Sequence, residues 1–354
     1  MKRKLKNIMV TGGAGFIGSN FIQYLFNNGF DGILVNVDSL TYAGNPENLT
    51  EIEKQHGEKN YFFKKCDIQD YKNIKDIFQQ YDIDAVIHFA AESHVDRSIY
   101  GPKEFIFTNI IGTFNLLEIA RELWKERDDV LFHHISTDEV FGSLGEKGYF
   151  TEETRYSPNS PYSASKAASD HLVRAYYKTY GLPCTISNCS NNYGPFQFPE
   201  KMIPLMICNA LEGKPMPVYG DGLNVRDWLY VEDHCEAISL IMHKGQDGQT
   251  YNIGGENEWK NIDLVNFLCE ILSSLTEINI EEYKKLITFI KDRPGHDRRY
   301  AIDCKKIKKV LGWSPGHTFE TGIEQTIKWY MNNQKWVENI KSGSYKEWIR
   351  KHYK

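Results

Sequence analysis

The stretch Ile8–Gly18, with the sequence IMVTGGAGFIG, decides the fold of this chain. Its apolar start predicts a short buried strand, and its spacing G-x-G-x-x-G opens a helix that runs to about Asn28. A second apolar strand, residues 33–37, ends at Asp38, an acid at the position that this fingerprint requires. Glycines let backbone N–H groups approach a pyrophosphate at the helix N-terminus. The stretch and its context therefore predict a dinucleotide site, with a glycine-rich turn that binds no ligand as the alternative.

Asp38 also indicates which dinucleotide binds. Its carboxylate would accept hydrogen bonds from the ribose hydroxyls of the adenosine half and would repel a 2′-phosphate. The next two residues, Ser39 and Leu40, offer no arginine that would offset this repulsion. We therefore expect NAD rather than NADP as the cofactor.

Strands and helices alternate through the first half of the chain. Further strands are predicted at residues 61–64, 85–89, 130–135 and 184–187, and helices at 71–80, 102–124 and 162–180. The alternation predicts an α/β fold with a doubly wound parallel sheet of the Rossmann type. Asp67 and Ile68 follow the third strand, where they would meet the adenine, although Asp67 is read equally well as a surface residue. Ala90 and Ala91 follow the fourth strand, and their small side chains would let a cofactor lie against the backbone.

The character of the chain changes after Asn188. Residues 190–195 have the composition of turns, and the remainder mixes short helices with loops. We expect an NAD-binding domain and a smaller C-terminal α/β substrate domain. The first comprises residues 1–188, with 230–256 rejoining its sheet, and the second comprises 189–229 and 257–354. The tail after Gln334 predicts an amphipathic helix that docks on its own chain.

The composition excludes several classes of protein. The chain has 354 residues and a net charge of −5, so no basic footprint points to nucleic acid. No apolar run approaches the roughly 18 residues of a membrane span, and the basic start lacks the long apolar stretch of a signal peptide. The seven cysteines are scattered without a C-x-x-C pair, which favours reduced thiols in a cytoplasmic protein. We expect no nucleic-acid partner, no membrane partner and no metal site.

A polar stretch and a tyrosine–lysine pair carry the candidate chemistry. The stretch Ser136–Glu139, STDE, follows the buried strand 130–135, and ligands in such sheets lie beyond the carboxyl ends of the strands. Tyr162 and Lys166 lie one turn apart on one face of a predicted helix. We expect the lysine to favour the phenolate and to lower the pKa of Tyr162, which would make it a base for an alcohol. Packing alone is the competing explanation of this pair.

Asp138 and Glu139 are adjacent acids, which on most surfaces form a solvated pair. Here they stand between a buried strand and Val140-Phe141-Gly142, which disfavours a solvated stretch. Adjacent side chains point in different directions on a regular element, so both reach one substrate only if the chain bends. If they converge, one would be protonated and act as an acid, while the other would act as a base. Such a pair would remove water next to an alcohol that has been oxidised to a ketone.

The predicted helix 102–124 is apolar around most of its circumference. A helix of this kind is buried on more than one side, and the sheet covers only one of them. A second copy of the chain is the simplest partner for the other side. We therefore expect a homodimer that forms through the helices 102–124 and 161–180.

Several motifs together resemble those of a known family, and the match runs over nearly the whole chain. The motifs are Thr11–Ser19, Ala90–Ser98, Ser136–Gly142, Tyr162–Lys166, Asn191–Pro195, Arg226–Trp228 and Arg293–Asp297. On these residues the chain resembles the extended short-chain dehydrogenase/reductases, in their NAD-dependent branch of nucleotide-sugar 4,6-dehydratases. Thr137-Asp138-Glu139 is the specific motif, since related 4-epimerases lack the acid pair and related decarboxylases typically keep Glu with Ser in place of Asp. Phe141 departs from the tyrosine that the family often has there.

The resemblance implies a reaction in three steps, with dTDP-glucose as the expected substrate. Tyr162, supported by Lys166, takes the proton of the 4-hydroxyl as hydride passes from C4 to NAD, and Thr137 hydrogen-bonds the 4-oxygen. Glu139 removes the C5 proton and Asp138 protonates the departing 6-hydroxyl. The hydride then returns to C6. The product would feed the biosynthesis of deoxysugars such as rhamnose.

The resemblance also implies further contacts with the two ligands. NAD contacts are expected from Gly12, Gly15, Phe16, Ile17, Gly18, Asp38, Asp67, Ile68, Ala90, Ala91, Tyr162, Lys166 and Asn188. Substrate contacts are expected from Ser93, Thr137, Asn191, Lys201, Met202, Pro217, Tyr219, Arg226, Asn261, Arg293 and His296. Arginine suits a pyrophosphate, because its planar fork matches phosphate oxygens. A surface ion pair is the competing reading of each of these arginines.

Three other functions stay open at this point. A UDP-glucose 4,6-dehydratase would differ only in the base that it recognises. A 4-epimerase or a decarboxylase would use the same Tyr162, Lys166 and NAD, but would not need both Asp138 and Glu139. A non-catalytic NAD-binding regulatory protein is disfavoured by the intact set of Thr137, Tyr162 and Lys166, because nothing would hold all three in place.

Overall fold

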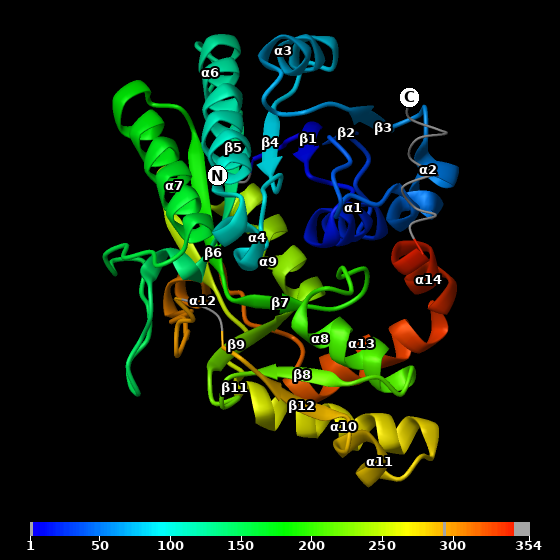
Figure 1. The fold of residues 1–354 in the computed structure, drawn as a ribbon. Coiled ribbons are helices and arrows are strands. Elements are labelled where there is room, and N and C mark those ends of the chain that lie inside the picture. The colour runs from blue at the N-terminus through cyan, green and yellow to red at the C-terminus, as the bar shows by residue number, and fades with distance from the viewer. Residues whose placement is uncertain (1–2, 293–294, 343–354) are drawn as a thin grey trace.

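A computed structural model describes residues 3–292 and 295–342 of the chain (Figure 1). Its central feature is a seven-stranded sheet with the strand order β10-β6-β5-β4-β1-β2-β3. The strands are β1 Asn7–Thr11, β2 Ile33–Asp38, β3 Tyr61–Lys65, β4 Ala85–His88, β5 Leu131–Thr137, β6 Cys184–Cys189 and β10 Thr250–Ile253. All neighbouring strands run parallel, which confirms the predicted doubly wound sheet.

Helices cover both faces of this sheet (Figure 1). They are η1 Pro46–Leu49, α1 Phe16–Asn27, α2 Thr50–His56, α3 Tyr71–Gln80, α4 Val95–Tyr100, α5 Pro102–Phe105, η2 Ile106–Gly112, α6 Thr113–Leu123, η3 Asp138–Phe141, α7 Pro161–Tyr180 and α9 Val231–Lys244. One core lies between the sheet and α3, α6 and α7, and another between the sheet and α1 and α9. The strand order reverses between β1 and β4, and ligands of such sheets bind outside the carboxyl ends at this point.

The helix predicted at residues 102–124 is continuous but not uniform. α5 passes into η2, which is a segment of π-helix, and η2 passes into α6. Residues such as Phe105 and Leu116 are buried on the inner side. The exposed apolar residues of η2 and α6 are Ile106, Phe107, Ile111 and Phe114. The apolar residues of this helix therefore lie on two sides, and the part of the chain that the structure describes covers only one of them.

A second group of elements lies below the sheet in Figure 1. It contains a three-stranded sheet, β11-β9-β7, and a two-stranded sheet, β12-β8. The elements are β7 Asn191–Tyr193, α8 Met202–Leu211, β8 Met216–Tyr219, β9 Val225–Tyr230, β11 Glu258–Lys260, α10 Asn261–Thr276, α11 Ile280–Lys284, β12 Ile287–Ile290, α13 Phe319–Asn332 and α14 Gln334–Ser342. The helix α12 Lys305–Leu311 instead packs against β10 of the main sheet and against α9. A separate core joins α8, α10 and α13. The chain thus builds a second hydrophobic core beside the main sheet.

The last described helix, α14, packs on the first half of the chain. Trp336 Nε1 donates a hydrogen bond to Asn48 Oδ1 at 2.9 Å, and Asn339 contacts the carboxylate of Glu47 at 3.2 Å. This confirms the predicted docking for residues 334–342, while the rest of the predicted tail lies outside the described residues. No helix within residues 3–292 and 295–342 is both long enough and apolar enough to cross a membrane.

Candidate active site

A cleft of about 380 Å³ opens at the carboxyl ends of the central strands. Asp38 and Asp67 line it after β2 and β3, and Thr137, Tyr162 and Lys166 line it after β5 and on α7. This volume falls within the usual range of small-molecule pockets, about 300–1,000 Å³. The predicted nucleotide residues and the predicted acid/base residues therefore share one cleft.

The glycine-rich turn presents bare backbone to this cleft. Gly12 has a φ of +70°, and a Cβ at this position would lie 2.7 Å from the backbone nitrogen of Ala90. Gly15 is the N-cap of α1, and no side chain caps this helix end in the part of the chain that the structure describes. Free N–H groups at a helix N-terminus bind phosphate groups. The turn therefore fits the pyrophosphate of a dinucleotide.

Asp38 forms the wall of the cleft at the end of β2. Its carboxylate accepts hydrogen bonds from the backbone N–H groups of Ala14 at 3.0 Å and Leu40 at 2.8 Å. Burial raises the pKa of Asp38, and these two N–H groups oppose the effect. The residues that follow along this wall are not basic: Ser39, Thr41, Tyr42, Ala43 and Gly44. The arrangement fits NAD, because a 2′-phosphate would meet the Asp38 carboxylate.

The acid pair lies where the chain bends. β5 ends at Thr137, and η3 follows as one turn of 3-10 helix. Thr137 Oγ1 accepts a hydrogen bond from the N–H of Glu139 and donates one to Asp138 Oδ1, both at 3.3 Å. Glu139 is half-buried and lines the cleft, whereas Asp138 is only 2% exposed and lies behind it. The bend therefore places two neighbouring carboxyl groups at different depths beside one site.

Asp138 and Glu139 differ in how deeply they are buried, and this difference separates their roles. Burial, the Glu139 carboxylate and then Asp227 raise the pKa of Asp138 well above its usual range, and Arg226 opposes them. Asp138 Oδ2 is buried and has no hydrogen-bond partner among the described residues. These effects favour the protonated form of Asp138, which is able to donate a proton, and they leave Glu139 as the base.

The structure corrects one expectation about Tyr162. Burial and the Glu139 carboxylate raise its pKa well above the usual value, and Thr137 only partly opposes them. Among the described residues Lys166 makes no hydrogen bond to the phenol, because its ammonium points to β5, where it donates a hydrogen bond to the Ile135 carbonyl at 2.7 Å. The spacing of four residues thus put Tyr162 and Lys166 on one face of α7 without turning the ammonium toward the phenol.

The other residues predicted for the two ligands fall into groups. Those that line the cleft are Gly12, Gly15, Phe16, Ile17, Gly18, Asp38, Asp67, Ile68, Ala90, Ala91, Ser93, Asn191 and Lys201. Those that do not line it, and belong to the second group of elements or the loops between them, are Met202, Pro217, Tyr219, Arg226, Asn261 and His296. Arg293 lies outside the described residues. Most of the predicted NAD contacts thus lie in one cleft, while most of the predicted substrate contacts do not line it.

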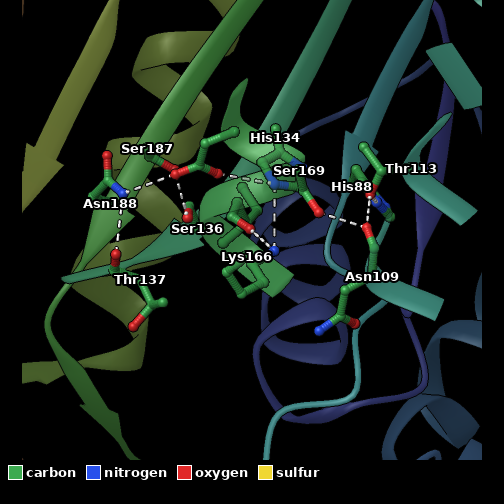
Figure 2. Close-up of polar contacts among 12 residues, drawn as sticks. His88, Asn109, Thr113, His134, Ser136, Thr137, Lys166, Ser169, Ser187 and Asn188 are labelled. Carbon is green, nitrogen blue, oxygen red and sulfur yellow. Dashed lines mark hydrogen bonds and ion pairs between the residues drawn. The ribbon is translucent and has the colours of Figure 1, made fainter. Parts of the chain in front are cut away.

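Arg226 and Asn188 are placed differently from the expectation. The guanidinium of Arg226 is buried, donates hydrogen bonds to the carbonyls of Val225 and Asp297, and lies 4.3 Å from the ring centre of Tyr300. Asn188 lies on β6, next to β5, and its amide donates a hydrogen bond to the Thr137 carbonyl at 3.0 Å (Figure 2). In this structure Asn188 therefore supports the turn at Thr137, and Arg226 acts on Asp138 through its charge.

Some residues of the cleft were not predicted from the sequence. Tyr42, Gln197 and Glu200 line the cleft from loops, where no periodic pattern identifies them. His134 and Asp170 contact the site from behind, next to Lys166 (Figure 2). Asp170 could have been predicted as a neighbour of Lys166, because it lies four residues after it in the sequence and therefore on the same face of α7.

The fold and the cleft together define a class of protein. A tyrosine and a lysine on one helix lie beside a dinucleotide turn in a parallel sheet, which is the arrangement of the short-chain dehydrogenase/reductases. A family model narrows the class: the model described as GDP-mannose 4,6 dehydratase matches residues 9–326, and the chain belongs to this family.

Individual relatives are similar over nearly their whole length. The chain is 54% identical over 360 aligned positions to a dTDP-glucose 4,6-dehydratase of Salmonella typhimurium, with 98% of each chain covered. Its structure is similar to that of a dTDP-glucose 4,6-dehydratase from Bacillus anthracis in complex with NAD, with 47% identity, a TM-score of 0.84 and coverage of 95% of this chain and 99% of that one. The enzyme of the same name from Streptomyces venezuelae, crystallised with NAD bound, has 42% identity and a TM-score of 0.87, with 94% and 99% covered.

Proposed function

We propose that this chain catalyses the NAD-dependent 4,6-dehydration of dTDP-glucose and forms dTDP-4-keto-6-deoxyglucose. The observation that carries the proposal is the buried Asp138, whose pKa lies well above its usual range, beside the half-buried Glu139, in a cleft that also holds Tyr162. An acid and a base on one turn supply what the elimination of water needs, and a simple dehydrogenase has no use for them. The curated relatives at about 54% identity carry the name of this activity.

The described residues divide the chemistry among them. NAD, when bound, supplies the acceptor for hydride from C4 and the donor that returns it to C6. Tyr162 takes the proton of the 4-hydroxyl, and the Thr137 hydroxyl donates a hydrogen bond to the 4-oxygen. Glu139 removes the C5 proton, which the 4-ketone has made acidic, and Asp138 gives its proton to the 6-hydroxyl, so that water leaves. Glu139 then returns its proton to C5.

Lys166 supports Tyr162 through its charge. Burial and the Glu139 carboxylate raise the pKa of Tyr162 and so disfavour its phenolate. A positive charge near the cleft is therefore required to favour the phenolate. Burial lowers the pKa of Lys166 to about 8, so most of this side chain is still an ammonium at neutral pH. We infer that the charge of Lys166, rather than a hydrogen bond seen in this structure, is its contribution to the reaction.

The test is to incubate the purified protein with NAD and either dTDP-glucose or UDP-glucose, and to follow the mass of the product. We expect the loss of one water with no net NADH, and a faster reaction with dTDP-glucose. A faster reaction with UDP-glucose would assign the other nucleotide. An unchanged mass with an inverted C4 would make the protein an epimerase and would overturn the proposal.

We further propose that the protein is a homodimer that forms through the helices 102–124 and 161–180. The exposed apolar residues of η2 and α6 support this assembly, because Phe107 and Phe114 would otherwise stay in water. Tyr180 adds an exposed ring at the end of α7. A second copy of the same helices offers a complementary apolar surface.

We also infer a cytoplasmic location and a two-domain organisation. All seven cysteines are free thiols, and six of them are buried, which suits a reducing compartment. The proposed NAD-binding domain comprises residues 1–188 with 230–256, and the proposed substrate domain comprises 189–229 and 257–354. The separate core around α8, α10 and α13 supports this division. The product is a precursor suited to deoxysugar pathways such as that of rhamnose.

A further inference from the structure

A buried chain of polar side chains lies behind Lys166 (Figure 2). Lys166 Nζ donates a hydrogen bond to the Ile135 carbonyl at 2.7 Å and lies 3.4 Å from His134 Nε2. The same ring nitrogen lies 3.3 Å from Asp170 Oδ1, and the side chains of His134 and Asp170 have no exposed surface. Neither residue lines the cleft, and the reaction described above assigns no part to either.

The second oxygen of the Asp170 carboxylate is held by three donors. Ser136 Oγ and the Tyr156 hydroxyl donate to Oδ2 at 2.8 Å, and the Asn188 amide approaches it at 3.4 Å. Figure 2 shows Ser136 and Asn188 on this side of the chain of polar groups. Burial alone would raise the pKa of Asp170, but His134, Lys166 and Tyr156 outweigh it, so the pKa lies below its ordinary value. The carboxylate is therefore ionised and fixed in place although it is fully buried.

The hydrogen-bond pattern decides where His134 carries its proton. With the proton on Nε2, that N–H faces Asp170 Oδ1 at 3.3 Å and also the Lys166 ammonium at 3.4 Å, and the lone pair of Nδ1 lacks a partner. With the proton on Nδ1, Nε2 would accept from Lys166, but the Nδ1 N–H would be buried without an acceptor among the described residues, and Asp170 Oδ1 would receive no proton from the ring. A buried donor and a buried carboxylate oxygen without partners cost more than one unused lone pair. His134 therefore carries its proton on Nε2 and is oriented by Asp170.

We propose that Asp170 and His134 are positioning residues for the reaction. The buried Asp170 carboxylate fixes the His134 ring, and its negative charge keeps Lys166 in the ammonium form at the cleft. Without an opposite charge, burial favours the neutral amine of a lysine. The inference rests on the proposed function, because it is there that the charge of Lys166 serves Tyr162.

Of the titratable groups around Lys166, Asp170 does most to keep its side chain charged. The titratable groups that face Lys166 are His88 on β4, His134 on β5, Glu139 on η3, Tyr162 and Asp170 on α7, and Cys189 on β6. Burial lowers the pKa of His134 to about 4 and that of His88 well below its usual value, so both rings are neutral. Burial raises the pKa of the Cys189 thiol to about 12, so it is neutral as well. Asp170 is thus the leading charge that opposes the effect of burial on Lys166.

The test is the pH dependence of single-turnover reduction of bound NAD by dTDP-glucose in the holoenzyme. The wild-type rate is expected to fall as the pH rises through about 8, where Lys166 loses its proton. Asp170→Asn keeps the size of the side chain and removes its charge, so the pKa of Lys166 falls and the decline moves to lower pH. We expect a loss of roughly five- to tenfold at pH 8 and of less than about twofold at pH 6, from a change of about one pH unit. An equal loss at both pH values would overturn the inference.

His133 provides the matched control. It precedes His134 on β5 but points to the opposite face of the sheet, where its ring contacts Thr185 Oγ1 at 2.8 Å and Ser187 Oγ at 3.2 Å. His133→Asn removes an equally buried ring without touching Lys166. We expect this variant to lose stability while the pH at which its rate declines stays that of the wild type. A shift like that of Asp170→Asn would mean that any damage to β5 moves the profile, and would overturn the inference.

A second measurement does not depend on a folded variant. In the wild-type holoenzyme labelled with ¹⁵N-histidine, the signal of His134 is expected to show a neutral ring with its proton on Nε2 from pH 6 to 9. A charged ring or a proton on Nδ1 would overturn the inference. A wild type that leaves dTDP-glucose unchanged would instead refute the proposed function, and the state of His134 would still be measured.

Discussion

At the scale of single residues, the depth of Asp138 gives the first prediction. Asp138→Asn keeps the size of the side chain but has no carboxylic proton to donate. We expect oxidation at C4 to continue while the loss of water slows by about 10²- to 10⁴-fold. Bound NADH should therefore accumulate in a stopped-flow trace. Product formation at the wild-type rate in this variant would refute the assignment of the acid.

Glu139→Gln is the matched comparison, since it changes the neighbouring acid in the same way. This variant should lose the exchange of the C5 hydrogen with solvent deuterium, whereas Asp138→Asn should retain it. The two variants separate proton abstraction from proton donation, because Glu139 lines the cleft and Asp138 lies behind it. If both variants lost the exchange equally, the division of roles by depth would be wrong.

At the scale of elements, the exposed side of η2 and α6 gives a prediction about assembly. The double variant Phe107→Asp/Phe114→Asp puts two carboxylates on the proposed dimer surface, where burial of an unpaired charge is unfavourable. We expect the protein to sediment as a monomer at micromolar concentration, whereas the wild type sediments as a dimer. Phe289→Asp is the control, because Phe289 on β12 is 55% exposed and lies on another element. A wild type that is already monomeric would exclude the proposed assembly.

The docking of α14 gives a second prediction at this scale. Trp336 packs against the rings of Trp329 and Phe196 at centroid distances of 5.0 and 6.1 Å, and it donates a hydrogen bond to Asn48. Trp336→Ala is expected to lower the free energy of unfolding by about 3–5 kcal/mol, measured in urea. Lys335→Ala, at an exposed position of the same helix, should change it by less than about 0.5 kcal/mol. Equal effects of the two variants would show that α14 contributes no core packing.

At the scale of the whole molecule, buried histidines make the stability depend on pH. Burial lowers the pKa of His133 and His234 to about 3 and that of His134 to about 4. The folded protein therefore keeps these rings neutral at pH 5, whereas the unfolded chain protonates them below about pH 6.5. The free energy of unfolding thus falls as the pH falls below 6.5, by about 2 kcal/mol for each ring between pH 7 and 5. Asp227 acts in the opposite direction, because burial raises its pKa to about 6 and the folded state takes up a proton there.

The variant His133→Asn isolates one of these contributions. It should be less stable than the wild type at pH 7, but its free energy of unfolding should change by about 2 kcal/mol less between pH 7 and 5. Urea denaturation at each pH measures both quantities. The same pH dependence in both proteins would mean that His133 is not held neutral in the folded state.

Local signals explain why much of the fold was predictable. Ser160 and Ser163 form a capping box at the start of α7, Pro161 is its first residue, and Gly181 ends it in the left-handed conformation with a φ of +70°. These signals lie within a few residues of the boundaries that they set, so the sequence predicted this helix almost to the residue. The same holds for the strand, turn and acid that form the NAD-binding wall between Ile8 and Asp38.

The sequence by itself determined the doubly wound sheet and the cofactor fingerprint, and it predicted the set Thr137, Asp138, Glu139, Tyr162 and Lys166. It could do so because each of these features depends on residues that lie close together in the sequence. Only the tertiary structure decided how these groups are charged. The raised pKa of Asp138 depends on its burial, on Glu139 and on Asp227, and the direction of Lys166 depends on Ile135, which lies 31 residues earlier in the chain. Burial and opposite charges shift a pKa through space and not along the chain, so side chains that meet only on folding set the charge of each group in the site.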